Sequence, residues 1–98
     1  MKYFAASYDY NPNNPRIAEE RPNHREFIGH LNDAGQILGS GPHPDSKGGA
    51  LIVVQFAGED ITLEQVIALM DQDPFWAEGL VTARAIREWN PVINSFEK

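Results

Sequence analysis

The stretch Asp71-Gln72-Asp73-Pro74-Phe75-Trp76 decides how the second half of the chain folds. Proline is favoured at the first position of a helix, and aspartate is a strong cap immediately before it. The pair Asp73-Pro74 therefore predicts that one helix ends near Asp71 and that a short helix starts at Pro74 and stops at Gly79. The positive end of a helix dipole attracts negative charge, so a carboxylate is expected at this start.

The helix before this stretch carries a full set of start signals. Thr62 is the expected N-cap, and Gln65 three residues later completes a capping box. Ile61 and Val66 are expected to form the hydrophobic staple. Four apolar residues at helical spacing form the predicted buried face: Leu63, Val66, Ile67 and Met70.

Another amphipathic helix is predicted nearer the N-terminus. Arg21 precedes a proline, which disfavours helix at that residue, so residues 16–20 are expected to form a separate turn. The helix is predicted to run from Pro22 to about Ala34 and to end at Gly35. The predicted inward stripe is His24, Phe27, Ile28, Leu31 and Ala34. Three polar residues are expected elsewhere on the helix: Arg25, Asn32 and Asp33.

Four segments have the composition of β-strands: residues 2–10, 36–41, 51–56 and 80–89. The glycines of the second segment are expected to allow close backbone approach. The resulting order is strand, helix, strand, strand, helix, strand. This order predicts an α+β fold of ferredoxin-like βαββαβ type, an antiparallel four-stranded sheet with the helices on one face.

The composition indicates one soluble globular domain over residues 1–98, with 42% hydrophobic and 22% charged residues. The net charge of −6, without any basic stripe, argues against a nucleic-acid partner. The absence of cysteine excludes a disulfide framework and a thiolate nucleophile. The longest apolar run, residues 50–54, is too short to cross a bilayer, and no signal peptide is recognisable. The prediction is a cytoplasmic protein with no membrane partner.

The second face of the predicted sheet needs a cover. At least three predicted strands carry apolar residues on both faces, whereas the helices cover one face only. A homodimer formed through the sheet face is the simplest solution. The tail, residues 91–98, contains Val92, Ile93 and Phe96 and is expected to dock on the domain or on the partner subunit.

Several short motifs occur in a recognisable order along the chain. Arg21-Pro22-x-His24 opens the first helix, Gly41-Pro42 follows the second strand, and Asp73-Pro74-Phe75 precedes Gly79-Leu80. From the first strand to Trp89, this arrangement resembles the YCII-domain family. The chain differs from the family pattern in a long polar segment before the first helix and in His43, which follows Gly41-Pro42.

The resemblance implies a dimeric α+β barrel whose cleft holds a His–Asp pair, here His24 and Asp73, proposed as catalytic. Related proteins include a dehydrochlorinase acting on a chlorinated muconolactone-type compound. The wider superfamily holds muconolactone isomerases and cofactor-free oxygenases.

Each member of this pair also has a structural alternative. His24 could be a half-buried histidine satisfied by a backbone carbonyl, and Asp73 could be only a helix cap. If both act, an aspartate held as an anion is a poor proton carrier but a good partner for an imidazole. Proton transfer is therefore assigned to His24, and orientation and charge stabilisation to Asp73.

Five further residues are candidates for substrate binding: Arg21, Gly41, Pro42, Tyr8 and Phe75. Arg21 could hold a carboxylate through its planar fork or be a solvated arginine at a helix start. Gly41 and Pro42 would shape a cleft wall. Tyr8, Phe75 and Trp89 have an alternative place in the core or at the dimer face.

No metal or other cofactor is predicted. His24 and His30 are six residues apart, which places them on different faces of a helix. The leading hypothesis is a cofactor-independent lyase or isomerase that removes a proton next to a carbonyl or lactone. The alternatives are a non-catalytic dimeric module for a small organic molecule, anionic if Arg21 binds it, and a purely structural dimer.

Overall fold

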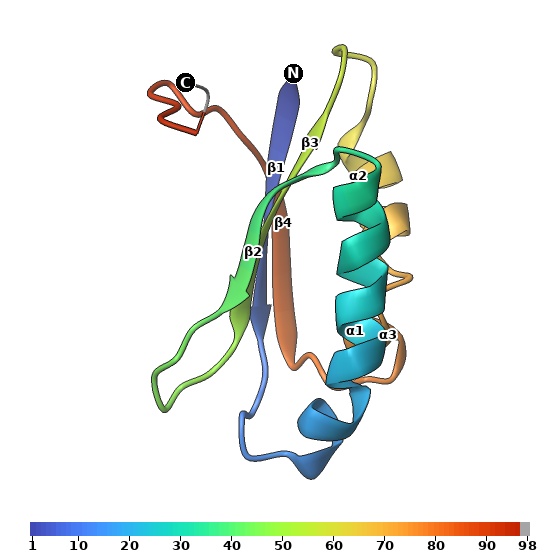
Figure 1. Cartoon of the computed structure of the whole chain (residues 1–98), viewed down its shortest axis with the longest axis vertical. Coiled ribbons are helices and arrows are strands. Elements are labelled where there is room, and N and C mark those ends of the chain that lie inside the picture. Colours follow the sequence, from blue (N-terminus) through green and yellow to red (C-terminus); the bar gives the residue numbers. More distant parts are fainter. Residues whose placement is uncertain (97–98) are drawn as a thin grey trace.

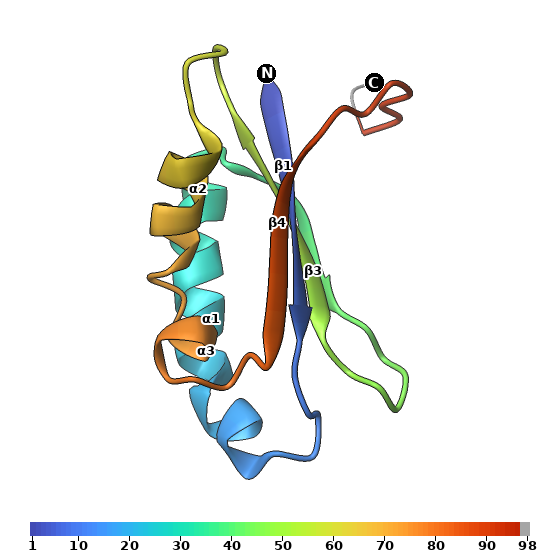
Figure 2. The ribbon, with the colours of Figure 1, turned by 180° about the vertical axis from the view of Figure 1, so that it is seen from behind.

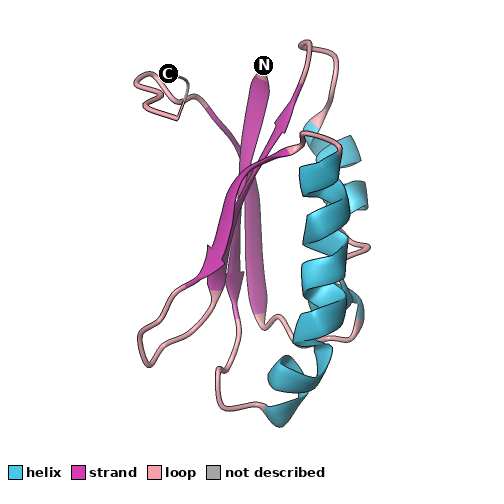
Figure 3. Ribbon diagram, viewed as in Figure 1, coloured by secondary structure: helices cyan, strands magenta, loops and turns pink. Residues whose placement is uncertain are grey.

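The computed structural model describes residues 1–96 and has the predicted α+β architecture. Within these residues, four strands form one antiparallel sheet in the order β2-β3-β1-β4, and the helices lie on one face of it (Figures 1 and 3). The strands are β1 (Lys2–Asp9), β2 (Ile37–Pro42), β3 (Ala50–Phe56) and β4 (Ala83–Trp89). The helices are α1 (Pro15–Asp33), α2 (Leu63–Met70) and α3 (Pro74–Ala77). The ferredoxin-like order is confirmed.

The core lies between the sheet and the helices. On the central strand β1, alternate side chains Phe4, Ala6 and Tyr8 are buried beneath the helices. Their partners on β3 include Ile52 and Val54, which are fully buried. None of the helices within residues 1–96 has the length and apolar character needed to cross a membrane.

Helix α1 is longer than predicted, and the expected break at Arg21 is wrong. Asn14 caps the helix by accepting a hydrogen bond from the backbone N–H of Arg16, so the polar segment already forms its first turns. Pro22 lies inside the helix, where proline costs about 3 kcal/mol and bends the axis. Figure 1 shows that bend. The first turns bury Ile17 completely, which offsets that cost by about 1.5–3 kcal/mol.

The second half of the chain follows the predicted start signals. Thr62 and Gln65 exchange the two hydrogen bonds of a capping box, and Asp73 caps α3. Two details differ. Leu63 is exposed at the start of α2, because the helix packs on the core through Val66 and Met70.

Other boundaries shift by one to three residues. Strand β4 starts at Ala83 rather than at Leu80, because Leu80 and Val81 turn into the core as a buried connection. The C-terminal end of α1 is also corrected: Ala34 is exposed, beyond the last helical residue, and does not belong to the buried stripe.

The helices leave the other face of the sheet open, and within residues 1–96 only the tail approaches it, at the end where Tyr3 is buried (Figure 2). Leu51 on β3 and Trp89 on β4 are exposed there. The tail leaves β4 on this side, and Asn94 donates a hydrogen bond from its side chain to the Tyr3 hydroxyl. Its apolar residues Val92, Ile93 and Phe96 remain exposed. Tail docking and dimerisation stay predictions, and residues 97 and 98 lie outside the described residues.

Candidate active site

The two candidate catalytic side chains, 49 positions apart in the sequence, are in contact. The Nδ1 atom of His24 lies 2.9 Å from each carboxylate oxygen of Asp73. His24 is 9% exposed and comes from the middle of α1, whereas Asp73 is fully buried at the start of α3. The packing of α1 against α3 brings the two together.

Two further donors surround the Asp73 carboxylate. The Tyr8 hydroxyl donates to Oδ2 over 3.0 Å, and the backbone N–H of Phe75 donates to Oδ1 over 3.0 Å. A carboxylate only accepts hydrogen bonds, so the third partner must also donate. This requirement places a proton on Nδ1 of His24. In the neutral imidazole, Nε2 then carries the free lone pair and is directed away from Asp73.

Tyr8 supports this arrangement from beneath. Burial raises the pKa of the Tyr8 phenol well above its usual range, and the neighbouring Asp73 charge adds to that effect, while Arg84 partly opposes it. The phenol therefore stays protonated and keeps donating to Asp73. Tyr8 is 1% exposed and does not line the cleft, so its placement does not support the predicted role in substrate binding.

The ring of His24 is also held from the side. It stacks on the ring of Phe75 with a centroid separation of 4.2 Å and an interplanar angle of 4°. Contact with Phe75 fixes the plane of the imidazole, and Asp73 fixes its rotation within that plane. Both restraints come from the Asp73-Pro74-Phe75 segment, so one short turn positions the histidine.

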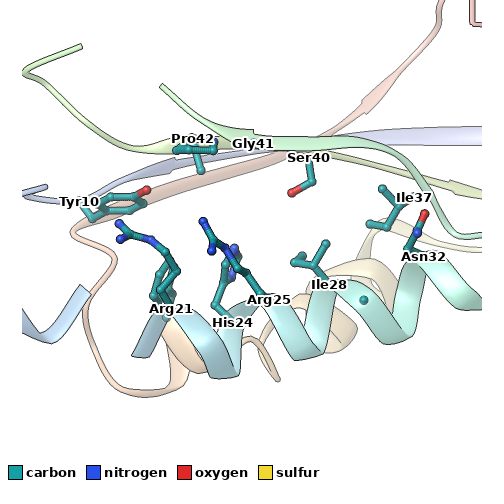
Figure 4. Close-up of a pocket in the computed structure, with 13 residues that line it drawn as sticks. Tyr10, Arg21, His24, Arg25, Ile28, Asn32, Ile37, Ser40, Gly41 and Pro42 are labelled. Atoms are coloured by element: carbon teal, nitrogen blue, oxygen red, sulfur yellow. The ribbon is translucent and has the colours of Figure 1, made fainter. Parts of the chain in front are cut away.

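A cleft of about 420 Å³ adjoins the exposed edge of His24. It lies between α1 and β2, and Figure 4 shows side chains from both elements directed into it. The lining residues are Tyr10, Arg21, His24, Arg25, Ile28, Gly29, Asn32, Ile37, Ser40, Gly41, Pro42, Ala50 and Phe75. Five of the predicted site residues are therefore present at one cleft: Arg21, His24, Gly41, Pro42 and Phe75.

The strand side of the cleft depends on a bulge. Pairing of β2 with β3 shifts between Ile37 and Gly39, which leaves Leu38 as an extra residue. Without this residue, Ile37 and Ser40 would point to opposite faces of the sheet. With it, Ile37, Ser40 and Pro42 pair with the buried residues Val54, Ile52 and Ala50 and lie on the helix side. The sequence contains no clear signal for this shift beyond Gly39.

The cleft concentrates positive charge in an acidic protein. Arg21 and Arg25 are two of the chain's eight lysines and arginines, and no aspartate or glutamate lines the cleft. Within residues 1–96, neither arginine forms an ion pair, whereas Arg16 pairs with Glu19 and Glu20 and Arg84 pairs with Asp71. In Figure 4 both guanidinium groups reach from α1 toward β2. Two unpaired guanidinium groups suit a carboxylate or another anion.

Arg25 and Asn32 lie outside the buried stripe of α1, as predicted, and both are exposed; their place at the cleft was not predicted. The cleft runs along the margin of the buried stripe of α1, so residues next to that stripe also line it. The detectable signal is the spacing of Arg21, Arg25 and Asn32, which repeats every four to seven residues on one side of a helix.

Several other expectations are settled by position. Trp89 lies on the uncovered sheet face against Tyr3, with ring centroids 6.3 Å apart, and is not at the cleft. His43 lies in the exposed loop after β2 and does not line the cleft. The expected close approach at Gly39 and Gly41 is wrong, because an added Cβ would have no neighbour within 4 Å at either position.

A glycine is required instead at Gly49. Its φ of +83° is unfavourable for other residues, and an added Cβ would lie 2.4 Å from the carbonyl oxygen of Tyr8.

In residues 1–96, no group of three or more histidine, aspartate or glutamate side chains is arranged to hold a metal ion.

The sequence of residues 1–90 matches the YCII-related domain family. The chain belongs to this family. Among functionally curated proteins, no sequence is significantly similar to the chain.

Two solved structures with the same fold are informative. The first is 5-chloro-2-hydroxyhydroquinone dehydrochlorinase (TftG) from Burkholderia phenoliruptrix, in complex with 2,5-dihydroxybenzoquinone. It has a TM-score of 0.73 and 18% identity, covering 90% of this chain and 93% of the dehydrochlorinase. The second is protein Atu4242 from Agrobacterium tumefaciens, with a TM-score of 0.59, 18% identity and 95% coverage of both chains. At these identities, the likeness establishes the fold of this YCII-related protein and not its substrate.

Proposed function

We propose that this YCII-related protein is a small acid–base enzyme that removes a proton next to a carbonyl or lactone of an anionic substrate. The observation that carries the proposal is the Asp73 carboxylate bound to Nδ1 of His24, beside a cleft with two unpaired arginines. Nε2 of His24 accepts the proton, Asp73 stabilises the resulting imidazolium, and Arg21 and Arg25 hold the negative charge of the substrate.

The reaction class follows from these groups. When the proton leaves for His24, the electron pair of the C–H bond forms a double bond. A leaving group then departs in an elimination, or the proton returns at another carbon in an isomerisation. Both outcomes are redox-neutral and need no cofactor. A fold shared with a dehydrochlorinase supports the elimination branch.

The arginines provide the first test of this proposal. We expect Arg21→Gln and Arg25→Gln each to weaken binding of small carboxylates by about 10–100-fold, because each removes a hydrogen bond to a charged group. Isothermal titration with benzoate and related acids measures the affinities, and a turnover screen with lactones, chlorinated hydroquinols and small acids follows. Arg16→Gln is the matched control, because Arg16 lies on the same helix but outside the cleft.

The outcomes separate the alternatives. Loss of affinity in the two cleft variants, together with turnover by the wild-type protein, supports the enzyme. Arginine-dependent binding without turnover of any compound supports a binding module instead. Equal affinities in all three variants and the wild type contradict an anion site in this cleft.

We also propose that a second copy of the chain covers the open face of the sheet. Exposed apolar side chains on that face, such as Leu51, and the exposed apolar tail support this occupant. We expect the wild-type protein to sediment at twice its chain mass. Leu51→Glu should weaken the dimer at least about 100-fold, since an isologous interface contains each substitution twice.

Leu63→Glu is the matched control for this experiment. Leu63 is an exposed leucine of the helix layer, on the opposite side of the molecule from the open sheet face. Sedimentation equilibrium across a concentration series measures both variants. A monomeric wild-type protein, or equal effects of the two substitutions, would be incompatible with this interface.

A further inference from the structure

Gly29 occupies a position in α1 where the fold does not require a glycine. It lies in the helix interior, where glycine costs about 0.5–1 kcal/mol relative to alanine. It is not among the glycines with positive φ, so its backbone conformation suits any residue. An added Cβ would have no neighbour within 4 Å, so close packing does not exclude a side chain either. What Gly29 does adjoin is the cleft, whose wall it forms.

The position of Gly29 continues the line of the two arginines. Arg21, Arg25 and Gly29 follow one another at intervals of four residues, which places them along one side of the helix. Each interval advances about 6 Å along the axis, and the span from Arg21 to Asn32 is about 16 Å. A side chain at position 29 would therefore fill the part of the cleft that lies beyond the arginines.

The two ends of the cleft differ in chemistry. Figure 4 places Arg21 and Arg25 toward one end and Ile28, Ile37 and Asn32 toward the other. No charged residue lines this second end. The Asn32 amide lies at its outer margin, beside Ile37. A cavity of about 150 Å³ is enough for a benzene ring. The volume of this cleft, about 420 Å³, is larger than the volume that a single small ring occupies.

We propose that the cleft binds an elongated organic acid, and that Gly29 is the residue that makes room for its apolar part. The anionic head lies between Arg21 and Arg25 beside His24, and a chain or second ring of several carbons lies over Gly29 between Ile28 and Ile37. This inference rests on the proposed function for the anionic head of the ligand. It adds that the rest of the ligand is long and apolar. Gly29 thereby sets the size of the ligand.

A chain-length series tests this inference without any need for turnover. Affinities of straight-chain carboxylates from acetate to octanoate are measured by isothermal titration for the wild-type protein, Gly29→Ala and Gly29→Leu. In the wild-type protein, affinity is expected to rise by about fourfold for each added CH₂ until the cleft is filled. The leucine side chain in Gly29→Leu would fill the apolar end of the cleft. We expect this variant to bind octanoate at least about tenfold more weakly than the wild-type protein does, while its affinity for acetate changes little.

Gly29→Ala is the control for folding and helix stability. Its methyl group enters open space and alanine favours helix, so the midpoint of thermal unfolding is expected to rise by about 2–8 °C. An affinity that does not depend on chain length overturns the inference, and so does an equal loss for acetate and octanoate in Gly29→Leu. Failure of every member of the series to bind overturns it as well.

The proposed function fails separately. If affinity rises with chain length but no compound is turned over, the proposal of an elongated ligand is supported and the proposed enzymatic function is contradicted. If turnover depends on His24 but affinity does not change with chain length, the enzymatic function is supported and the proposal of an elongated ligand is contradicted.

Discussion

The His24→Asn variant is expected to lose about 10²–10⁴-fold in turnover while its fold and ligand affinity change little. The asparagine amide can still donate a hydrogen bond to Asp73, so the buried carboxylate keeps a partner. It has no group that accepts a proton at neutral pH. The substitution therefore removes the proton acceptor and leaves the surrounding arrangement in place.

Turnover is measured on every compound that the wild-type protein converts in the lactone, hydroquinol and acid screen. His30→Asn is the matched control, because His30 lies on the same helix, is exposed and does not line the cleft. A loss confined to His24→Asn agrees with proton transfer by this imidazole. Turnover within about threefold of the wild-type value in His24→Asn would remove His24 from the mechanism.

Substitution of Asp73 is expected to affect both stability and turnover. Asp73→Ala leaves the donors of Tyr8, His24 and Phe75 without an acceptor in a fully buried site. Breaking a buried arrangement of this kind costs about 3–5 kcal/mol, so the urea midpoint should fall markedly. Asp33→Ala, which removes an exposed acid at the end of α1, should change stability by less than about 0.5 kcal/mol.

Asp73→Asn separates orientation from folding. The asparagine oxygen can still accept from Phe75, and its amide nitrogen would then donate to Nδ1 of His24. This reversal moves the imidazole proton to Nε2, where it blocks the base, and turnover is expected to fall by up to about 10⁴-fold. A folded Asp73→Asn protein with wild-type turnover would show that Asp73 is a helix cap and nothing more.

Local signals in the sequence were sufficient to predict most of the fold. The Thr62 capping box, the Asp73 cap and the closing glycines at 35 and 79 each act within a few residues, and each is present in the structure. The break at Pro22 was wrong because its outcome depends on a distant contact. Burial of Ile17 against the core favours continuation of the helix through the proline, and no local rule contains that contact.

The site was predictable only in part, for a similar reason. His24, Asp73 and Arg21 belong to motifs, and the structure brings them to one place. Ser40 and Ile37 reach the cleft through a bulge that is set by pairing of β2 with β3. The support of Asp73 by Tyr8 joins residues 65 positions apart, which a pattern along the chain does not reveal.

The central claim is that Asp73 holds the proton of His24 on Nδ1 and leaves Nε2 free beside the cleft. The most direct test is the pair of imidazole nitrogen chemical shifts of His24, recorded by NMR on protein with ¹⁵N-labelled histidine above the pH at which the ring is charged. The account predicts a protonated Nδ1, coupled to a downfield proton that vanishes in Asp73→Ala, and an unprotonated Nε2. A proton on Nε2 in the wild-type protein would contradict it.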